Sequence, residues 1–170
     1  MPTYIALLRA VNVGGTGKLP MADLKSLCQD LGFEQVRTYI ASGNVVFQSN
    51  LPEAEVKSVL NAGLHAYAGK PVGAIIRTAA EIAGVVKRNP FSERPGNRSV
   101  ALFVDEPLPA DALLHATGGK DEVASLGLRE IFIFYPTSMA DSRLRIPAAK
   151  AGTARNMNTV AKLAEMAAAL

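Results

Sequence analysis

The sequence predicts an α+β fold in which two related units, each ferredoxin-like, share a core. Three observations support this prediction. The first half of the chain has the element order β-α-β-β-α-β, and the second half has an abbreviated β-α-β-β-α order. The predicted central strands are apolar at successive positions. With 170 residues, of which 49% are hydrophobic and 19% charged, the chain is long enough to bury such a core.

The first unit is predicted over residues 1–78. A strand, "TYIALLR", precedes a helix that opens on Pro20 and stops at Gly32. Two strands, "QVRTYIAS" and "NVVFQS", are joined around Gly43 as a hairpin. The segment "LPEAEVKSVLNAGLHAYAG" is the second predicted helix, and "VGAIIRT" is the fourth strand.

Residues 79–170 are predicted to hold a connecting helix, the second unit and a basic C-terminal helix. The connecting helix, "AAEIAGVVKRN", stops before Pro90. The strand "SVALFVD", the short helix "PADALLHATG", and the hairpin "EVASLG" with "REIFIFYP" follow. The closing helix is predicted over "TARNMNTVAKLAEMAAAL", so the final strand of the second unit is missing from this prediction.

The burial pattern adds a constraint on the sheets. The runs "YIALL", "VALFV" and "IFIFY" have no polar alternation, so we expect interior strands that are covered on both faces. In the first helix, Leu24, Leu27, Cys28 and Leu31 form one stripe, which predicts that Cys28 is a buried and unreactive thiol.

Composition limits the compartment and the chemistry. A lone cysteine excludes a disulfide framework, and no apolar run approaches the about 20 residues of a membrane helix. We therefore expect a cytoplasmic protein. His65 and His115 have no ligand-type neighbours at metal spacing, so neither a metal site nor a cofactor is predicted. His65 is expected to be a solvated helix residue.

The stretch "RAVNVGGTGKLPM" runs from a strand through a glycine-rich loop into a helix. It lacks the glycine spacing and the Ser or Thr of a P-loop, and it also fails the Rossmann fingerprint. Glycine backbone N–H groups and a helix N-terminus nevertheless favour an anion. Lys18 stands just before this helix, where an acidic residue is more usual.

A second helix start shows the same anomaly. In "GTARNMNTV", Thr153 is a good N-cap, which predicts that Arg155 and Asn156 lie in the first helical turn. A cation there opposes the helix dipole, at a cost of about 0.3–1 kcal/mol. A bound anion would remove this penalty, so the two helix starts together favour an anion site.

Two further stretches carry polar side chains. Ser142 lies beside arginines in "DSRLR", but no base is evident that would activate it as a nucleophile. The stretch "ASGN" is most simply the turn of a hairpin, although Ser42 and Asn44 could also present polar groups to a ligand.

Taken together, the stretch from Arg9 to Phe47, "NPF" at 89–91, "DSRL" and "GTARNMNTVAKL" resemble the family called domain of unknown function 1697. The similarity follows the family's order along nearly the whole chain. It implies a bacterial-type soluble protein with a duplicated ferredoxin-like fold, and it supplies no activity, substrate or catalytic residue. The matched positions are Arg9, Asn12, Gly14, Gly15, Met21, Tyr39, Ser42, Gly43, Asn44, Ser142, Thr153, Arg155, Asn156 and Thr159. The family usually has glycine where Ala10 stands and tryptophan where Met157 stands, and the missing tryptophan weakens the case for an aromatic stacking platform in this chain.

The leading functional hypothesis is a site for a small ligand that bears a phosphate or carboxylate group, placed at the helix starts. Whether the chain is an enzyme stays open. One alternative is binding of RNA or single-stranded nucleic acid, but "SGNVVFQS" supplies only Phe47 as an aromatic. Another is a protein-interaction module that uses the basic C-terminal segment. The expected anion-binding residues are Arg9, Asn12, Gly14, Gly15, Lys18, Ser42, Asn44, Ser142, Arg155 and Asn156.

Overall fold

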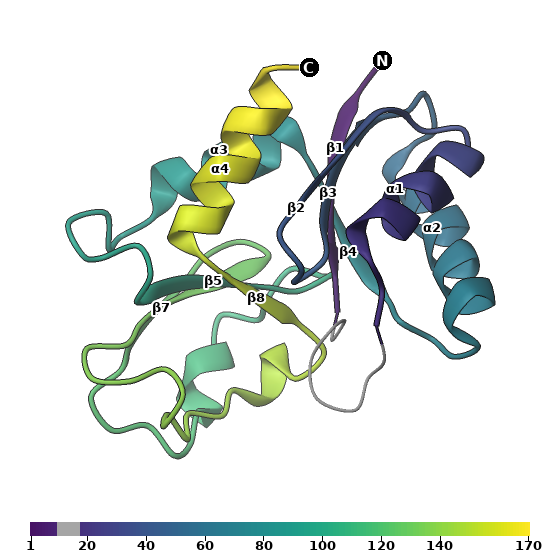
Figure 1. The fold of residues 1–170 in the computed structure, drawn as a ribbon. Coiled ribbons are helices and arrows are strands. Elements are labelled where there is room, and N and C mark those ends of the chain that lie inside the picture. The colour runs from purple at the N-terminus through teal and green to yellow at the C-terminus, as the bar shows by residue number, and fades with distance from the viewer. Residues whose placement is uncertain (10–17) are drawn as a thin grey trace. The chain divides into compact units, whose positions relative to one another are not determined.

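A computed structural model describes residues 1–9 and 18–170 of the chain. It confirms the α+β class: the described residues form two four-stranded antiparallel sheets and four α-helices (Figure 1). The chain divides into two compact units, one of Met1–Ala83 with Lys162–Leu170 and the other of Gly84–Ala161. In the described part of the chain, no helix is long and apolar enough to cross a membrane.

The first unit has the predicted element order. Its sheet has the strand order β2-β3-β1-β4, so β1 and β3 are interior strands. The hairpin predicted around Gly43 is present, because β2 and β3 pair antiparallel. The elements are β1 (Thr3–Leu8), α1 (Met21–Asp30), β2 (Glu34–Tyr39), β3 (Asn44–Gln48), α2 (Glu53–Ala68) and β4 (Ala74–Thr78), after which α3 (Ala79–Arg88) begins.

One face of this sheet packs in a single core cluster with residues of α1 and α2. Alternate residues of β1, such as Tyr4 and Ala6, join Cys28 in this cluster. Phe47 of β3 stacks on Phe33, with ring centroids 4.2 Å apart. Burial raises the pKa of the Cys28 thiol to about 12. The prediction that Cys28 is buried is confirmed.

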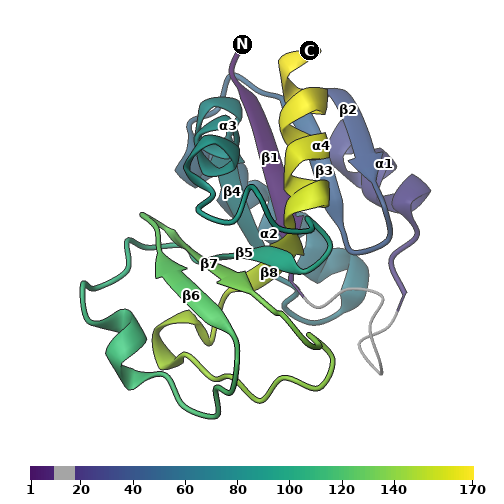
Figure 2. The same cartoon turned by 90° about the vertical axis from the view of Figure 1, so that its left-hand side faces the viewer.

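The opposite face of the same sheet is also buried, as the continuous apolar strands predict. Ile5 and Leu7 of β1 are fully buried there, and so is Val46 of β3. Figure 2 shows the C-terminal turns of α4 (Met157–Ala168) in front of this sheet, and Leu163 and Ala167 of those turns are buried. Polar and apolar residues therefore do not alternate along β1, because neither face of this strand is exposed to water.

The second unit has the strand order β6-β7-β5-β8, and its interior strands β5 and β7 hold "VALF" and "IFIF" as predicted. The predicted hairpin of β6 and β7 is also present. Alternate side chains such as Val100 and Ile133 form an apolar cluster with Ile146. The elements are β5 (Ser99–Phe103), η2 (Ala112–His115), β6 (Val123–Leu126), β7 (Glu130–Phe134), η3 (Pro147–Ala149) and β8 (Thr153–Asn156).

Three sequence predictions for this unit are corrected by the structure. The fourth strand is not missing, because β8 pairs with β5, and the closing helix starts only at Met157. The reason is that Asn156 rather than Thr153 is the cap: its Oδ1 accepts the N–H of Thr159 at 2.9 Å. The short helix predicted over "PADALLHATG" is a single 3₁₀ turn of four residues.

Candidate functional site

Several predicted site residues meet at one end of the first sheet. Arg9 directly follows β1, and its backbone N–H donates to the carbonyl of Gly73 at 3.1 Å, just before β4. The N–H of Leu8 donates to the carbonyl of Gly43, in the β2–β3 turn, at 2.8 Å. Antiparallel pairing therefore brings the end of β1, the turn with Ser42 and Asn44, and the start of β4 to the same sheet end.

The side chain of Arg9 lies against the backbone of Gly73. A Cβ atom placed on Gly73 would be 3.4 Å from Cδ and 3.6 Å from Nη1 of Arg9, and Gly73 has a φ of +81°. Gly73 also lines a pocket of about 250 Å³ between α2 and the loop that leads to β4. The other lining residues are Asn61, Ala62, His65, Pro71 and Val72. Arg9 thus packs against Gly73, a residue of the pocket wall, but does not itself line the pocket.

The chain segment that lines the pocket is basic. It has no acidic residue from Val56 to Ala80, while it carries Lys70 next to the lining residue Pro71. Within the part of the chain that the structure describes, the Arg9 side chain makes no ion pair. As expected, His65 is exposed, and its ring now also lines the pocket. The local charge favours a negatively charged occupant.

Asn61 stands out among the pocket residues because its Oδ1 is buried and has no hydrogen-bond partner. A buried polar atom without a partner costs about 1–3 kcal/mol of stability. Its neighbours along α2 that face the core, Leu60 and Leu64, are apolar. This residue could not be predicted as special from the sequence, because one Asn in an amphipathic helix is normally solvated.

Ser42 and Asn44 have a structural role in the β2–β3 turn. Asn44 is fully buried, and its Nδ2 donates to the carbonyl of Tyr39 and to Oγ of Ser42, both at 2.9 Å. The turn itself contains Ile40 and Gly43 at positive φ. The hairpin interpretation of "ASGN" is therefore confirmed, and these hydrogen bonds occupy the amide of Asn44.

Of the stretch that holds the glycine-rich loop, the structure describes Arg9 and the residues from Lys18 onward. Lys18 is exposed, and Pro20 occupies the N-cap position of α1 without a side-chain hydrogen bond to cap it. The predicted residues Asn12, Gly14 and Gly15 lie outside the described residues.

The predicted position of Arg155 is wrong. Arg155 lies within β8, opposite Ala101 of β5, and not in the first turn of α4. It is buried, and its Nη1 donates to Oγ1 of Thr153 at 2.8 Å and to the carbonyl of Ala154 at 3.0 Å. Burial lowers the pKa of Arg155 to about 10. Arg155 therefore does not oppose the dipole of α4, because this helix starts after Asn156.

Ser142 joins two loops of the second unit. Its Oγ donates to Oε1 of Glu122 at 2.5 Å and accepts the N–H of Leu144 at 3.3 Å. Hydrogen bonds from the Lys120 N–H and from Ser142 hold the pKa of the Glu122 carboxyl below its usual value. Glu122 is thus stabilised as the anion and is a poor base for Ser142. The sequence could not reveal this pair, since twenty residues separate its members.

The same two loops approach closely at Gly118. Thr117 and Arg145 exchange backbone hydrogen bonds of 2.9 and 2.8 Å, and Thr137 donates to Asp121. Gly118 has a φ of +73°, and a Cβ atom there would overlap the carbonyl oxygen of Arg143. A pocket of about 260 Å³ lies between the loops. Its polar groups already bond to one another, which favours a structural role.

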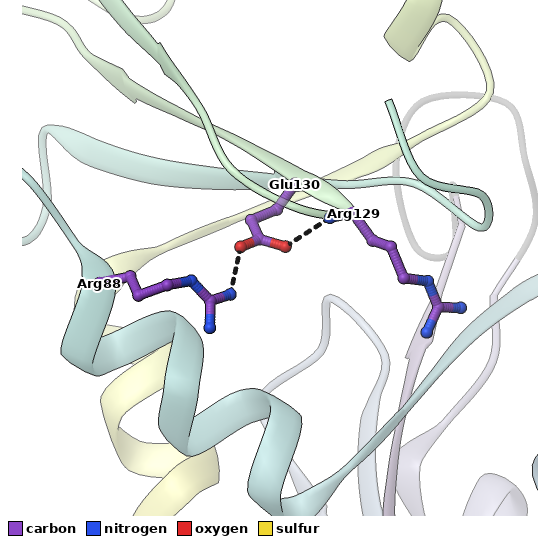
Figure 3. Close-up of polar contacts among 3 residues, drawn as sticks. All are labelled: Arg88, Arg129 and Glu130. Carbon is purple, nitrogen blue, oxygen red and sulfur yellow. Dashed lines mark hydrogen bonds and ion pairs between the residues drawn. The ribbon is translucent and has the colours of Figure 1, made fainter. Parts of the chain in front are cut away.

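The second unit also contains a buried carboxylate that was not predicted from the sequence. Glu130 is only 2% exposed, and its Oε1 lies 2.6 Å from Nη2 of Arg88, while its Oε2 accepts the N–H of Arg129 at 3.0 Å (Figure 3). The position of an acid at the start of the apolar run "EIFIF" was the available signal. Arg88 neutralises this carboxylate, so the trio stabilises the unit and leaves no free base.

Two other kinds of site gain no support from the side chains. The only aromatic of β3, Phe47, is buried against Phe33 and cannot stack on a nucleic-acid base. Across residues 1–9 and 18–170, no group of three or more His, Cys, Asp or Glu side chains is placed to hold a metal ion.

Comparisons with known proteins give a family model and a similar solved structure. A solved structure described as "the structure of conserved bacterial protein SP0830 from Streptococcus pneumoniae" is similar, with a TM-score of 0.79 and 27% sequence identity. The similarity covers 97% of this chain and 98% of that chain. No curated protein has significant sequence similarity to the chain. Residues 1–132 match the family model described as "Protein of unknown function (DUF1697)", and the chain therefore belongs to that family.

Proposed function

We propose that the protein binds a small ligand with a phosphate or carboxylate group in the pocket beside Arg9. The observation that carries this proposal is the Arg9 side chain against Gly73, a residue that lines the pocket together with Asn61 and His65. A guanidinium presents paired N–H donors that match the oxygens of a carboxylate or phosphate. The amide of Asn61 and a ring N–H of His65 would add further donors.

The size of the pocket narrows the ligand class. Its volume of about 250 Å³ is below the about 300–1,000 Å³ of typical drug-sized ligand sites. A short carboxylic acid or a small phosphate ester therefore fits better than a whole nucleotide. The apolar lining residues Val72 and Pro71 would contact the carbon skeleton of such a ligand.

The proposal differs from the sequence hypothesis in the residues that hold the anion. Arg9 keeps its predicted role, and Lys18 remains a second cation for testing. Arg155 has no place in a helix-terminus site, since it lies within a strand. Asn61 and His65 of α2 replace it as ligand contacts.

Thermal-shift and calorimetric titrations with inorganic phosphate test the proposal, with chloride at matched ionic strength as the reference. Phosphate should raise the Tm above the chloride value, because a ligand that binds only the folded state stabilises it. Arg9→Gln should abolish this gain. Arg37→Gln is the matched control, because Arg37 is exposed on β2 of the same sheet and should not affect the gain. Equal effects of phosphate and chloride on the wild type would contradict the proposal.

We also propose that the two units are copies of one ferredoxin-like arrangement. The support is the equivalence of their strand orders, β2-β3-β1-β4 and β6-β7-β5-β8, in which each strand of one sheet has a counterpart four strands later. In each unit an α-helix follows the fourth strand directly, α3 after β4 and α4 after β8. An alignment of the two halves by structure should superpose β1 on β5 and β4 on β8.

A further inference from the structure

We infer that the ligand of the Arg9 pocket carries a hydroxyl group next to its anionic group, and that Asn61 binds this hydroxyl. This inference rests on the proposed function and adds a second recognition element to it. Asn61 and Gly73 line the same pocket, and the Arg9 side chain lies against Gly73. In this inference the hydroxyl lies at the Asn61 amide, and the anionic group extends past Gly73 toward the Arg9 side chain.

The Asn61 amide has no structural hydrogen bond to the described residues. Its Oδ1 is buried without a hydrogen-bond partner, and the described residues supply no hydrogen bond to the side chain. A leucine of similar size would avoid this cost on a helix whose buried residues are Val56, Leu60 and Leu64. Residues that break a local rule with no structural gain are frequently functional.

The chemistry of the amide selects a hydroxyl. A primary amide offers both an acceptor and two donors, and a hydroxyl can donate to the oxygen or accept from the nitrogen. The terminal torsion of Asn is broad, so either atom of Asn61 can turn toward the ligand. An ammonium group can only donate, and the nearby Arg9 would repel it. A hydroxy acid or a hydroxylated phosphate ester therefore fits better than an amino acid.

Paired ligands that differ in one hydroxyl test the inference by calorimetry or NMR titration. The carboxylate arm compares propionate with 2-hydroxypropionate, and the phosphate arm compares propyl phosphate with 2-hydroxypropyl phosphate. Wild-type protein should bind the hydroxylated member of at least one pair about five- to tenfold more tightly. The arm with the larger preference identifies the anionic group that the site accepts.

Asn61→Leu should remove this preference while binding of propionate or propyl phosphate persists. The ligand-free variant should also melt at a higher temperature, because an unpaired buried amide is gone. Asn50→Leu is the matched control, since Asn50 is exposed before α2 and should leave the preference intact. Asn61→Ala provides a smaller replacement that should likewise lose the preference.

These experiments distinguish failure of the proposed anion site from failure of the hydroxyl inference. If the wild type binds both members of each pair equally, and Arg9→Gln still abolishes binding, the hydroxyl inference is wrong and the anion site stands. A preference that persists in Asn61→Leu also overturns the inference. If none of the four anions binds the wild type, the proposed function fails and the inference fails with it.

Discussion

The two units have equivalent strand orders but very different helical cover. In the first unit, α1 and α2 have 10 and 16 residues and contribute to a core cluster of fifteen buried residues among those described. In the second unit, the corresponding connections contain the 3₁₀ helices η2 and η3, of 4 and 3 residues. The apolar cluster there has six buried residues in the described part of the chain.

The last strands of the two units are alike in detail. Arg77 of β4 and Arg155 of β8 are both buried, and each donates from Nη1 to the carbonyl of the residue before it, at 2.9 and 3.0 Å. In each case the next residue caps an α-helix: Thr78 accepts the N–H of Glu81 at 3.1 Å, and Asn156 accepts the N–H of Thr159.

This comparison shows that the sheet topology does not require long helices on its outer face. In the second unit, Gly118 follows η2 at a positive φ of +73°, and Pro147 is the first residue of η3, so neither 3₁₀ helix extends past these positions. The interior strands retain their apolar runs in both units. Strand pairing therefore sets the common plan, and helix length follows from the local sequence.

The largest expected difference between the units is in core packing. Phe47→Ala should lower the free energy of unfolding by about 3–5 kcal/mol, because it removes the stack on Phe33 inside the larger cluster. Ile133→Ala should cost about 2–3 kcal/mol, since half-buried neighbours in its smaller cluster can relax into the space. Denaturant unfolding of both variants measures the difference. A larger loss of unfolding free energy for Ile133→Ala than for Phe47→Ala would contradict this ranking of the two cores.

The next effect concerns the buried carboxylate, which only the second unit has in its described core. Arg88→Ala should destabilise the protein by about 2 kcal/mol, because it leaves Glu130 buried without its cation. The loss is below the about 3–5 kcal/mol of fully buried pairs, since Arg88 is 42% exposed. Glu130→Gln should cost less, because a neutral amide can stay buried and Arg88 can be hydrated. Equal losses in denaturant unfolding would contradict this asymmetry.

Alkaline pH should weaken the first unit through Cys28. The folded pKa is about 12, whereas an unfolded thiol ionises near its ordinary value of about 8.5–9. Between these values the unfolded state releases the proton first, so the free energy of unfolding should fall by up to about 1.4 kcal/mol per pH unit. Arg155 has the opposite sign: burial of its cation costs stability below its folded pKa of about 10, and this cost falls as the pH rises above that value.

A Cys28→Ala variant isolates the thiol contribution. Its stability should fall less steeply from pH 9 to 10.5 than that of the wild type, although its stability at neutral pH is lower because of the cavity. The native thiol should also react slowly with a thiol reagent at pH 8. Identical pH slopes in the two proteins would show that Cys28 does not carry the effect.

The smallest expected effects are those of the two caps. Thr78→Ala and Asn156→Ala should each cost about 1 kcal/mol. Thr78 should cost slightly more, because Glu81 also accepts the Thr78 N–H at 3.0 Å in a capping box. Thermal unfolding of both single variants measures this ranking. No loss in either variant would mean that the helices do not depend on these caps.

The sequence predicted the first unit well because its signals are local. The stripe with Cys28, the turn at Gly43 and the continuous apolar strands each appear within a few residues. The start of α4 was misplaced because Thr153 and Asn156 are both good caps, and only the pairing of β8 with β5 decides between them. Asn61 was missed for a similar reason, since its unpaired amide and its pocket exist only after α2 packs.

The close approach at Gly118 has a consequence for the comparison of relatives. A side chain at this position would overlap the backbone of Arg143, and the left-handed backbone of Gly118 itself disfavours any residue with a side chain. Gly118 is thus a diagnostic marker for the joined loops of the second unit. A relative that aligns well in its first half but has a bulky residue here must carry a different second-unit loop, whatever its overall identity.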